Sequence, residues 1–366
     1  MIRYCNFLLR EIKQSTLVVL MVVYLFLKLD KNKIMSTKKY AVIGGGSWAT
    51  AIVKMLSENL NTVGWYMRNE DAIAHLKTEF HNPNYLSSVE FDINKLKISA
   101  DINEIVDYAD VVIFAIPSAF VNTELQKMTV SLKEKIIFSA IKGIVPETNL
   151  IVGEHFHKQY GIPFKNIGVI TGPCHAEEVA LERLSYLTIA CASEDNAKMV
   201  ANVLSSWYIK CKTSDDVIGT EYAAMLKNIY AIAAGIAHGL GYGDNFQSVL
   251  MSNAIREMDR FIKKRHKMDR NINDSAYLGD LLVTGYSVFS RNRMFGNMIG
   301  KGYTVKSAQM EMSMVAEGYY ATNCAYILNT TSSNFAITPI IDAIYQILYK
   351  RKNPKNIFKK LTDKLD

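Results

Sequence analysis

The chain has 366 residues, 49% of them hydrophobic, which is enough for a substantial core and, by length, for two domains. Charged residues make up 21% without an acidic or low-complexity tract, so the composition excludes an intrinsically disordered protein. The net charge is +7, but residues 1–34 hold six lysines and arginines against two acids and account for +4 of it. Basic runs interleaved with aromatic residues do not occur in the remainder, so nucleic-acid binding is not expected.

The cysteines and histidines bear on the compartment and on metal binding. The five cysteines are scattered, odd in number and without CxxC spacing, which is typical of a reducing compartment. This pattern argues against a disulfide framework and against a zinc site. The seven histidines show no ligand spacing either, so we expect a cytoplasmic protein without a metal.

Residues 1–34 precede the first expected strand and allow three interpretations. The apolar stretch Leu17–Leu27 has eleven residues, fewer than the roughly 20 that span a bilayer. A membrane-tethered enzyme is one interpretation, and this stretch would then be the tether. Basic residues before it resemble a signal peptide, yet no clear small-x-small cleavage site follows. Met35 begins MSTKKYAVIGGG, which is the usual length of lead-in to a first strand. We therefore expect residues 1–34 to be an upstream extension outside the fold, and we expect no stable membrane insertion.

From Lys39 onward, short apolar strands alternate with helices. The expected strands read YAVIGG, TVGWYM, VVIFAIP, IIFSAIKG, IGVITGP and LTIACA, and the expected helices read SWATAIVKMLSEN, ADINEIVDYA and SEDNAKMVANVLSSW. Asp101 is a plausible N-cap of the second helix. The strands are continuous apolar runs, as expected when both faces of a parallel sheet are covered. The pattern predicts an α/β fold in which residues 38–214 form a Rossmann-type, doubly wound parallel sheet.

After about Thr213 the pattern becomes helical. The segment GTEYAAMLKNIYAIAAGIAHGL predicts one long helix that is apolar almost all round, and such a helix is buried. Further helical segments follow, with loops that contain glycine and asparagine. Residues 215–366 are therefore predicted to form an all-helical C-terminal domain.

The turn after the first strand reads GGGSWATA from Gly44. Gly44 permits a tight turn, Gly46 lets the backbone approach a pyrophosphate, and Ala49 is small enough for the helix to pack on the strand. The pyrophosphate would lie at the N-terminus of the helix that begins at Ser47, where free N–H groups and the helix dipole favour an anion. The motif predicts dinucleotide binding, and a glycine turn of any α/β protein is the alternative.

The end of the second strand bears on the choice of cofactor. An NAD site usually carries an acid there to hold the ribose hydroxyls. Here the strand ends YMRN at Asn69, and the first acids, Glu70 and Asp71, come later. Arg68 can pair with a 2′-phosphate and so favours NADP over NAD, with a solvated surface arginine as the alternative.

Several polar residues lie where the apolar pattern predicts burial or a cleft. Lys142 ends the strand IIFSAIK, at the edge where ligands of open sheets bind. Lys227 lies within the apolar helix, where a lysine is costly unless it is used or paired, and Asp280 lies in GDLLVT. The segment Ser290–Asn292 offers a compact set of donors for a phosphate monoester. The alternatives are a surface lysine at a strand end, a snorkelling lysine and an N-cap aspartate.

These residues stand in segments that closely resemble the bacterial NAD(P)-dependent sn-glycerol-3-phosphate dehydrogenases, from about Lys39 to about Tyr345. The matching segments occur in the order and spacing of that family and read GGGSWATA, AIPS, KGIVPET, GPCHAEEVA, EYAAMLKNIYAIAAGIAHGLGYGDN, GDLLVT, SRNRMFG and VAEGYYAT. The resemblance implies reversible hydride transfer between NAD(P)H and dihydroxyacetone phosphate. The product, sn-glycerol 3-phosphate, would serve glycerophospholipid synthesis, and whether the protein is a homodimer stays open.

The resemblance also implies roles for individual residues. Lys227 would be the proton donor and acceptor, and it would act with Lys142 and Asp280 as the catalytic group. With the glycine loop included, the expected cofactor-binding residues are Gly44, Gly46, Ser47, Trp48, Arg68, Lys142, Ala176, Arg291, Val315 and Glu317. The expected substrate-binding residues are Lys142, Gly172, Lys227, Asp280, Ser290, Arg291 and Asn292.

The sequence departs from the family at Cys174, and two alternative functions have to be weighed. Cys174 stands where the family usually has a serine or threonine, so a hydroxyl contact to the substrate would be weakened there. A β-hydroxyacid dehydrogenase of the same architecture is one alternative, against which the SRNR and GYGDN segments argue. A non-catalytic NADPH-sensing protein is the other, and it has no reason to keep Lys142, Lys227 and Asp280 together.

Overall fold

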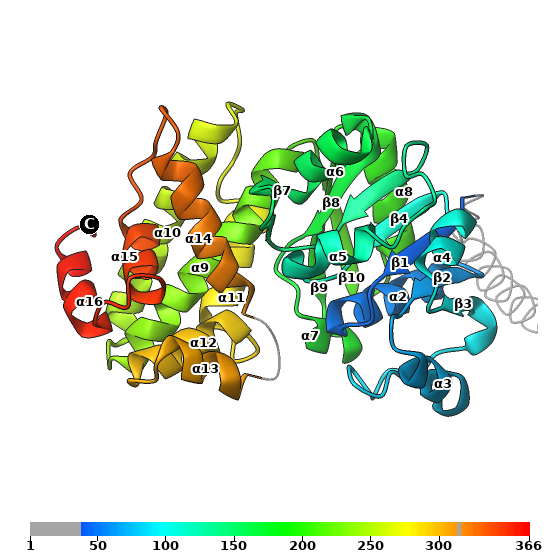
Figure 1. Ribbon diagram of the computed structural model, residues 1–366, viewed down its shortest axis with the longest axis horizontal. Helices are drawn as coiled ribbons and strands as arrows, with labels where there is room; N and C mark the ends of the chain where they lie inside the picture. Colours follow the sequence, from blue (N-terminus) through cyan, green and yellow to red (C-terminus); the bar gives the residue numbers. More distant parts are fainter. Residues whose placement is uncertain (1–37, 313–315) are drawn as a thin grey trace, which may run out of the picture. The chain divides into compact units, whose positions relative to one another are not determined.

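The structure is a computed structural model that describes residues 38–312 and 316–366 (Figure 1). An eight-stranded sheet with helices on both faces holds residues 40–214, and helices follow from residue 217 to the C-terminal segment. The prediction for residues 1–34 lies outside the described residues. Within the described ranges, no helix combines the length and the apolar character that crossing a membrane requires.

The sheet follows the apolar runs of the sequence. Its strands, in chain order, are β1 (Tyr40–Ile43), β2 (Val63–Tyr66), β3 (Leu96–Ser99), β4 (Val111–Phe114), β5 (Ile136–Ser139), β8 (Ile167–Thr171), β9 (Ser185–Cys191) and β10 (Ile209–Ser214). They lie in the order β10-β9-β8-β5-β4-β1-β2-β3, so the chain changes direction across the sheet between β1 and β4. Every residue of β1, β2, β4, β5 and β8 is buried, as the continuous apolar runs predict. Ligands of open α/β sheets bind at such a switch point.

One strand direction differs from the prediction of a parallel sheet. Strand β9 runs antiparallel to β8, and β10 is parallel to β9. The connection from β8 contains only the helix α7 (Ala176–Ala180), which packs against α2 (Ser47–Asn59). Five helical residues rise about 7.5 Å, whereas five strand residues span about 16 Å. The helix is therefore too short to carry the chain back along the strand, and β9 returns beside β8 in the opposite direction.

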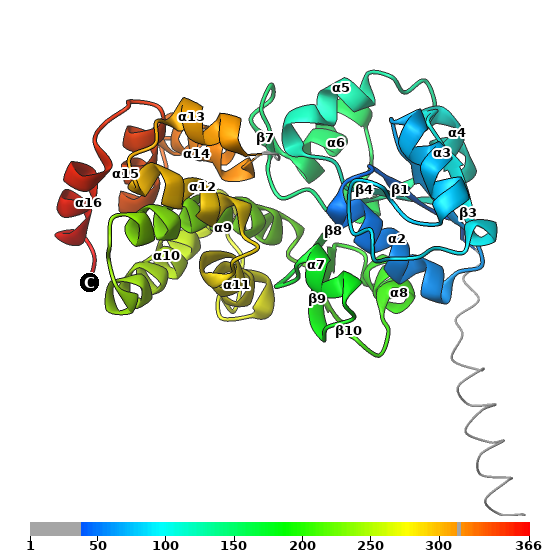
Figure 2. The same cartoon turned by 90° about the horizontal axis from the view of Figure 1, so that it is seen from below.

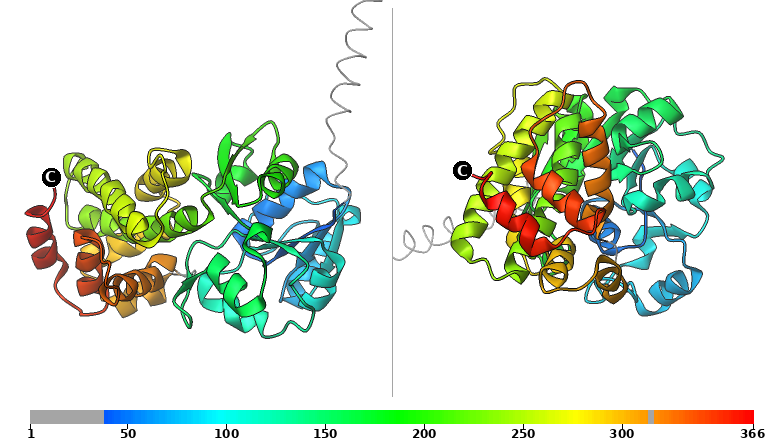
Figure 3. Two further views of the ribbon diagram at one scale, coloured as in Figure 1. Left: turned by 90° about the horizontal axis from the view of Figure 1, so that it is seen from above. Right: turned by 60° about the vertical axis from the view of Figure 1, so that its left-hand side comes forward.

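Helices cover the sheet on both faces (Figure 3). The helices α2, α3 (Glu70–Glu79) and α8 (Glu194–Leu204) share a core with one face, and α4 (Ile102–Tyr108), α5 (Val121–Leu125) and α6 (Val152–Tyr160) with the other. A small hairpin, β6 (Ile144–Val145) and β7 (Leu150–Ile151), lies between β5 and α6. The predicted N-cap is present, since Asp101 Oδ1 accepts a hydrogen bond from Asn103 N at 2.8 Å.

The long apolar helix predicted after residue 215 is α9 (Val217–Gly239), and it is the centre of the helical half (Figure 2). Every residue from 219 to 237 is buried. The other helices are α10 (Asp244–Arg265), α11 (Asp280–Tyr286), α12 (Arg291–Gly300), α13 (Val305–Glu311), α14 (Glu317–Thr330), α15 (Pro339–Leu348) and α16 (Pro354–Thr362). Five of them, α10, α11, α12, α14 and α15, pack directly on α9.

Glycines set the close crossing of α9 and α12. A Cβ atom at Gly235 would lie 2.0 Å from the carbonyl oxygen of Arg293, and one at Gly296 would lie 2.2 Å from that of Ile232. Only glycine permits this approach, because any side chain would collide with backbone of the partner helix. The crossing holds the N-terminus of α12, and with it Arg291, beside α9.

A buried ion pair anchors the start of α9, and its loss should destabilise the fold. The Asp216 carboxylate accepts from Gly219 N at 2.9 Å, from Arg270 Nε at 2.8 Å and from the Tyr277 hydroxyl at 2.5 Å. We expect Arg270→Ala to lower the free energy of unfolding by about 3–5 kcal/mol, because it leaves a buried carboxylate uncompensated. Urea denaturation measures this change.

The exposed pair Lys263–Asp259 on α10 provides the matched control. Lys263→Ala should change the free energy of unfolding by at most about 0.5 kcal/mol, because exposed pairs are screened by solvent. Equal losses in the two variants would show that burial of the Arg270 pair carries no stability.

Candidate active site

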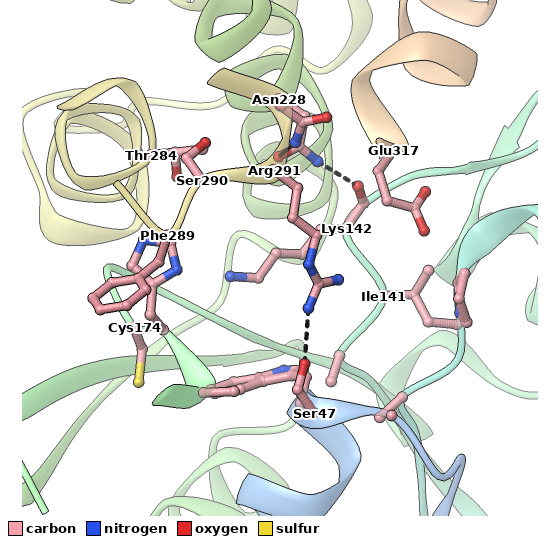
Figure 4. A pocket seen from close by; sticks show the side chains of 18 of the residues that line it. Ser47, Ile141, Lys142, Cys174, Asn228, Thr284, Phe289, Ser290, Arg291 and Glu317 are labelled. Atoms are coloured by element: carbon pink, nitrogen blue, oxygen red, sulfur yellow. Dashed lines mark hydrogen bonds between the residues drawn. The ribbon is translucent and has the colours of Figure 1, made fainter. Parts of the chain in front are cut away.

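A cavity of about 220 Å³ opens at the carboxyl ends of β1, β4 and β5 (Figure 4). The strands contribute the glycine loop, the segment 115–117 and the segment 140–142 to its wall. The helical half contributes residues from α9, from α11 and α12, and from the start of α14. The cavity therefore lies at the switch point of the sheet and is bordered by helices of the C-terminal half.

Two lysines and one aspartate that are far apart in the sequence meet beside this cavity. Lys227 on α9 is 3% exposed, and its ammonium forms an ion pair with Asp280 Oδ1. Lys142 Nζ lies 4.0 Å from the other oxygen, Asp280 Oδ2. Asp280 is fully buried at the first position of α11 and stands between the two ammonium groups. The structure thus brings together the three residues predicted to form the catalytic group.

The surroundings of Lys227 change its proton affinity. Burial lowers the pKa of the Lys227 ammonium, the charge of Asp280 raises it, and the charge of Lys142 lowers it again. The net direction is downward from a usual value near ~10.4. A lysine whose pKa moves toward neutral pH can both give and take a proton, which is what acid–base catalysis needs.

Two interactions position Lys142, one at its ammonium group and one at its backbone carbonyl oxygen. It follows β5 in a loop, and its Nζ lies 5.5 Å from the centroid of the Trp48 ring, within cation–π range. Asn228 Nδ2 donates a hydrogen bond to the Lys142 carbonyl oxygen at 2.9 Å. The loop after β5 is therefore tied to the helix that carries Lys227.

Asn228 also begins a chain of amide hydrogen bonds that sequence reasoning missed. Its Oδ1 accepts from Asn292 Nδ2 at 2.9 Å, and Asn292 Oδ1 accepts from Gly318 N at 2.9 Å. The chain links α9, α12 and α14. A buried polar residue inside the apolar run of α9 was the sequence signal that could have identified Asn228.

Arg291 joins the helical half to the glycine loop. Its Nη2 donates to Ser47 Oγ at 2.9 Å, and both side chains line the cavity (Figure 4). Ser290 is the N-cap of α12 and accepts from Arg293 N at 3.3 Å. Three predicted ligands, Ser290, Arg291 and Asn292, are thus presented together at the start of α12.

Glu317 joins the start of α14 to the loop after β4. Its carboxylate accepts from Ser118 N at 3.1 Å and from Ser118 Oγ at 2.5 Å. Burial raises the pKa of this carboxyl group, while the bonds from Ser118 and the charge of Arg291 oppose the rise. Ser118 was quoted in the AIPS segment but was not predicted as a site residue. Val315, the other cofactor residue expected here, lies outside the described residues.

The glycine loop has the backbone geometry that a dinucleotide needs. Gly44 has φ of +136°, and a Cβ atom there would lie 2.4 Å from the carbonyl oxygen of Ala115. A Cβ atom at Gly46 would meet nothing within 4 Å, so this side of the loop is open to a ligand. No side chain caps the N-terminus of α2, which leaves its N–H groups for an anion. Ala49 is fully buried, in keeping with its predicted packing role.

A second cavity of about 660 Å³ continues from the glycine loop past Arg68. Arg68 is exposed at its wall, beyond the end of β2. The loop itself is supported by Asn82, whose Nδ2 donates to Gly45 O at 3.1 Å and to Thr50 Oγ1 at 2.9 Å. The two cavities share residues of the glycine loop together with Arg291 and Glu317, so an extended ligand can occupy both. Asn82 is a further supporting residue that the sequence reasoning missed.

The remaining predicted residues are Trp48, Ala176 and Gly172. Trp48 and Ala176 line the first cavity. Gly172 does not line it; it has φ of +121°, and a Cβ atom there would lie 2.7 Å from the carbonyl oxygen of Tyr186. Across residues 38–312 and 316–366, no group of three or more His, Cys, Asp or Glu residues is placed to hold a metal ion.

Comparison with known proteins identifies the family. The model of the NAD-dependent glycerol-3-phosphate dehydrogenase N-terminus matches residues 39–197, and that of its C-terminus matches residues 216–359. The chain belongs to the NAD-dependent glycerol-3-phosphate dehydrogenase family. These matches confirm the predicted family and the Rossmann-type fold with a helical C-terminal part. They also confirm the dehydrogenase activity and the use of NAD(P).

Individual relatives agree with this assignment. The glycerol-3-phosphate dehydrogenase of Exiguobacterium sp. is 35% identical over 324 residues, which cover 88% of this chain and 94% of the relative. That of Macrococcus caseolyticus is 34% identical over 313 residues, covering 85% and 93%. The crystal structure of glycerol-3-phosphate dehydrogenase from Coxiella burnetii has a TM-score of 0.81 and 26% identity, and covers 89% of this chain and 98% of that one.

Proposed function

We propose that the chain reduces dihydroxyacetone phosphate to sn-glycerol 3-phosphate reversibly, with Lys227 as the proton donor and acceptor. The observation that carries this proposal is the buried Lys227 beside Asp280 and Lys142, at a cavity that Arg291 connects to the glycine loop. The cofactor, when bound, supplies or accepts the hydride at the substrate carbon. Negative charge then develops on the substrate oxygen, and a positioned ammonium both stabilises that charge and delivers the proton.

The other residues of the cavity would hold and orient the substrate. Three cations line it, Lys142, Lys227 and Arg291, which suits a phosphate dianion and a polarised carbonyl. Ser290 and Asn292 stand beside Arg291 at the start of α12; one amide hydrogen of Asn292 is donated to Asn228, and the other remains for the substrate. Phosphate binding at this point would fix the distance from the reacting carbon to Lys227.

The residues that would hold the dinucleotide lie along the two cavities. The pyrophosphate fits the open Gly46 and the uncapped N-terminus of α2, near Gly44 and Ser47. Trp48, Lys142, Ala176, Arg291 and Glu317 are proposed for the nicotinamide end, with Val315 as predicted from the sequence. Gly172 is proposed for the substrate site through its backbone.

Assays with two substrate classes test the function. We expect oxidation of NADPH with dihydroxyacetone phosphate, and no reduction of NAD(P)+ with a β-hydroxy acid, because the cavity presents phosphate ligands. Turnover of the β-hydroxy acid alone would favour the carboxylate-directed alternative. Tight NADPH binding without turnover of any triose or ketose phosphate would favour a sensing protein.

We propose that Arg68 makes the enzyme prefer NADP over NAD, since an exposed guanidinium at the wall of the second cavity can pair with a 2′-phosphate. Arg68→Ala should lower the ratio of kcat/KM for NADPH to that for NADH by about fivefold to tenfold, because the pair is solvent-exposed. Lys77→Ala, an exposed cation on α3 outside that cavity, should leave the ratio as it is. An unchanged ratio in Arg68→Ala would show that Arg68 does not contact the 2′-phosphate.

We further propose that residues 38–214 act as the dinucleotide-binding domain and residues 215–366 as the substrate-binding domain. The product would feed glycerophospholipid synthesis in the cytoplasm, without stable membrane insertion. The scattered cysteines and the use of a soluble nicotinamide cofactor support this location. Light scattering would test the homodimer that the family resemblance leaves open.

A further inference from the structure

A further cavity lies at the C-terminal end of α10, and the proposed function does not use it. Its volume is about 470 Å³, and its lining residues are Lys263, Lys264, Lys267, Met268 and Asn334. All three lysines are exposed. Because charge of one sign dominates its wall, the cavity favours an anionic ligand.

The cations at this end of α10 are neutralised only in part within the protein. Lys263 pairs with Asp259, one turn earlier on the same helix, at 2.7 Å. Arg260, Lys264 and Lys267 form no ion pair with another residue in the ranges that the structure describes. Their charges are therefore available to a partner from outside.

Two apolar side chains project from the loop 331–338, which joins α14 to α15 and carries no charged residue. Phe335 is 63% exposed and Ile337 is 70% exposed, whereas Ala336 between them is buried. The buried Asn329 holds this conformation, because its Oδ1 accepts from Ala336 N at 2.8 Å and its Nδ2 donates to Ala336 O at 2.9 Å. The fold thus fixes the backbone so that both apolar side chains face outward.

Hydrogen bonds join this loop to the basic end of α10. Asn334 Nδ2 donates to Lys264 O at 3.2 Å, and Arg260 Nε donates to Ile337 O at 3.2 Å. The exposed apolar side chains therefore lie beside the cations. We call this surface the docking face, and its residues are Arg260, Lys263, Lys264, Lys267, Phe335 and Ile337.

The docking face lies away from the active site. Helix α14 runs from Glu317, in the wall of the active-site cavity, to Thr330, next to the loop of the docking face. These 13 residues correspond to about 20 Å at the rise of an α-helix. A partner on the docking face would therefore leave the active-site cavity open.

We propose that the docking face binds reversibly to an anionic lipid surface. Lipid phosphates would lie at the lysines, and Phe335 and Ile337 would enter the apolar layer just below the headgroups. A protein partner matches less well, because lysine is depleted in protein–protein interfaces. A nucleic acid also matches less well, because Phe335 is the single aromatic ring of the docking face and offers little stacking. The contact is peripheral, and it goes beyond the proposed function without depending on it.

Flotation of the full chain with lipid vesicles tests the proposal. We expect binding to vesicles of phosphatidylglycerol and phosphatidylcholine, and none to phosphatidylcholine alone. High salt should release the protein, because the Debye length falls from about 10 Å at ~0.1 M to about 3 Å at ~1 M. Lys264→Ala combined with Lys267→Ala should weaken binding by about 20-fold or more, since each cation near an anionic surface contributes about fivefold. Phe335→Ser should weaken it by about tenfold, whereas Phe335→Leu, which stays apolar, should retain it.

Lys301→Ala combined with Lys306→Ala is the matched control. Both lysines are exposed, and they lie at the end of α12 and in α13, at the lower edge of the helical half in Figure 1, whereas the loop after α14 is at the upper edge. This variant should bind vesicles as the wild type does, and urea denaturation should show every variant to be folded. Equal losses in the two double variants would overturn the proposal, because binding would then follow net charge alone. Wild-type protein that ignores anionic vesicles, or binding that survives all substitutions in the docking face, would overturn it as well.

Discussion

Lys227→Ala should lower kcat for reduction of dihydroxyacetone phosphate by about 10³- to 10⁴-fold. The variant loses the group that delivers the proton and also the positive charge that stabilises the developing oxyanion. The cofactor cavities are lined mainly by the glycine loop and the strand ends, so NADPH affinity should change little. Steady-state kinetics at saturating substrate gives the loss in kcat, and a fluorescence titration with NADPH gives the affinity.

Lys227→Arg separates the two contributions. Arginine keeps a positive charge near Asp280 but does not release its proton at accessible pH. We expect it to recover substrate binding without recovering more than a small part of kcat. If Lys227→Ala turned over within tenfold of the wild type, another group would have to be the acid, and the assignment of Lys227 would be wrong.

Asp280→Asn should shift the pH profile of both reaction directions toward acid and lower the rate of reduction at neutral pH by about tenfold. Asp280 is the carboxylate between Lys227 and Lys142, and its charge raises the pKa of Lys227. Without it, burial and Lys142 act unopposed, and the pKa of Lys227 falls further. Reduction needs the protonated amine, so it is active below this pKa and is lost as the pH rises through it. Oxidation needs the neutral amine, so its rise with pH should begin at a lower pH in the variant.

Glu257→Gln is the matched control for Asp280→Asn. Glu257 is likewise a fully buried carboxylate of the helical half, but it accepts from Ile340 N and Ile341 N at the start of α15, away from the cavity. Its substitution should affect stability and leave both pH profiles in place. Profiles that stay unchanged in Asp280→Asn would contradict the electrostatic role assigned to Asp280.

The glycine loop and the central helix illustrate what local sequence can predict. Gly44, Gly46 and Ala49 were predicted from the spacing of one turn; Gly44 has the positive φ of a tight turn, and Ala49 is fully buried. The length and burial of α9 followed from an apolar run without polar faces. Lys142 and Lys227 were identified because a charge in an apolar run costs free energy unless it has a partner.

The structure differs from the sequence prediction where distant residues determine the outcome. The antiparallel direction of β9 depends on how the short α7 packs against α2, which the apolar pattern of the strand does not encode. The amide chain from Asn228 through Asn292 to Gly318 joins three helices, and amide side chains carry no periodic signal.

Local patterns were enough to recognise the family, the alternation of strands and helices before residue 214, and the charged residues available for catalysis, because these depend on local periodicity and on motifs of a few residues. The packing of distant elements places Asp280, 53 residues from Lys227, between the two lysines, and it brings Arg291 to Ser47 across 244 residues. Such pairs form only when packing brings their elements together, and burial then sets their charge states. Each catalytic residue could be identified in the sequence, but the fold is what brings Lys227, Lys142 and Asp280 together.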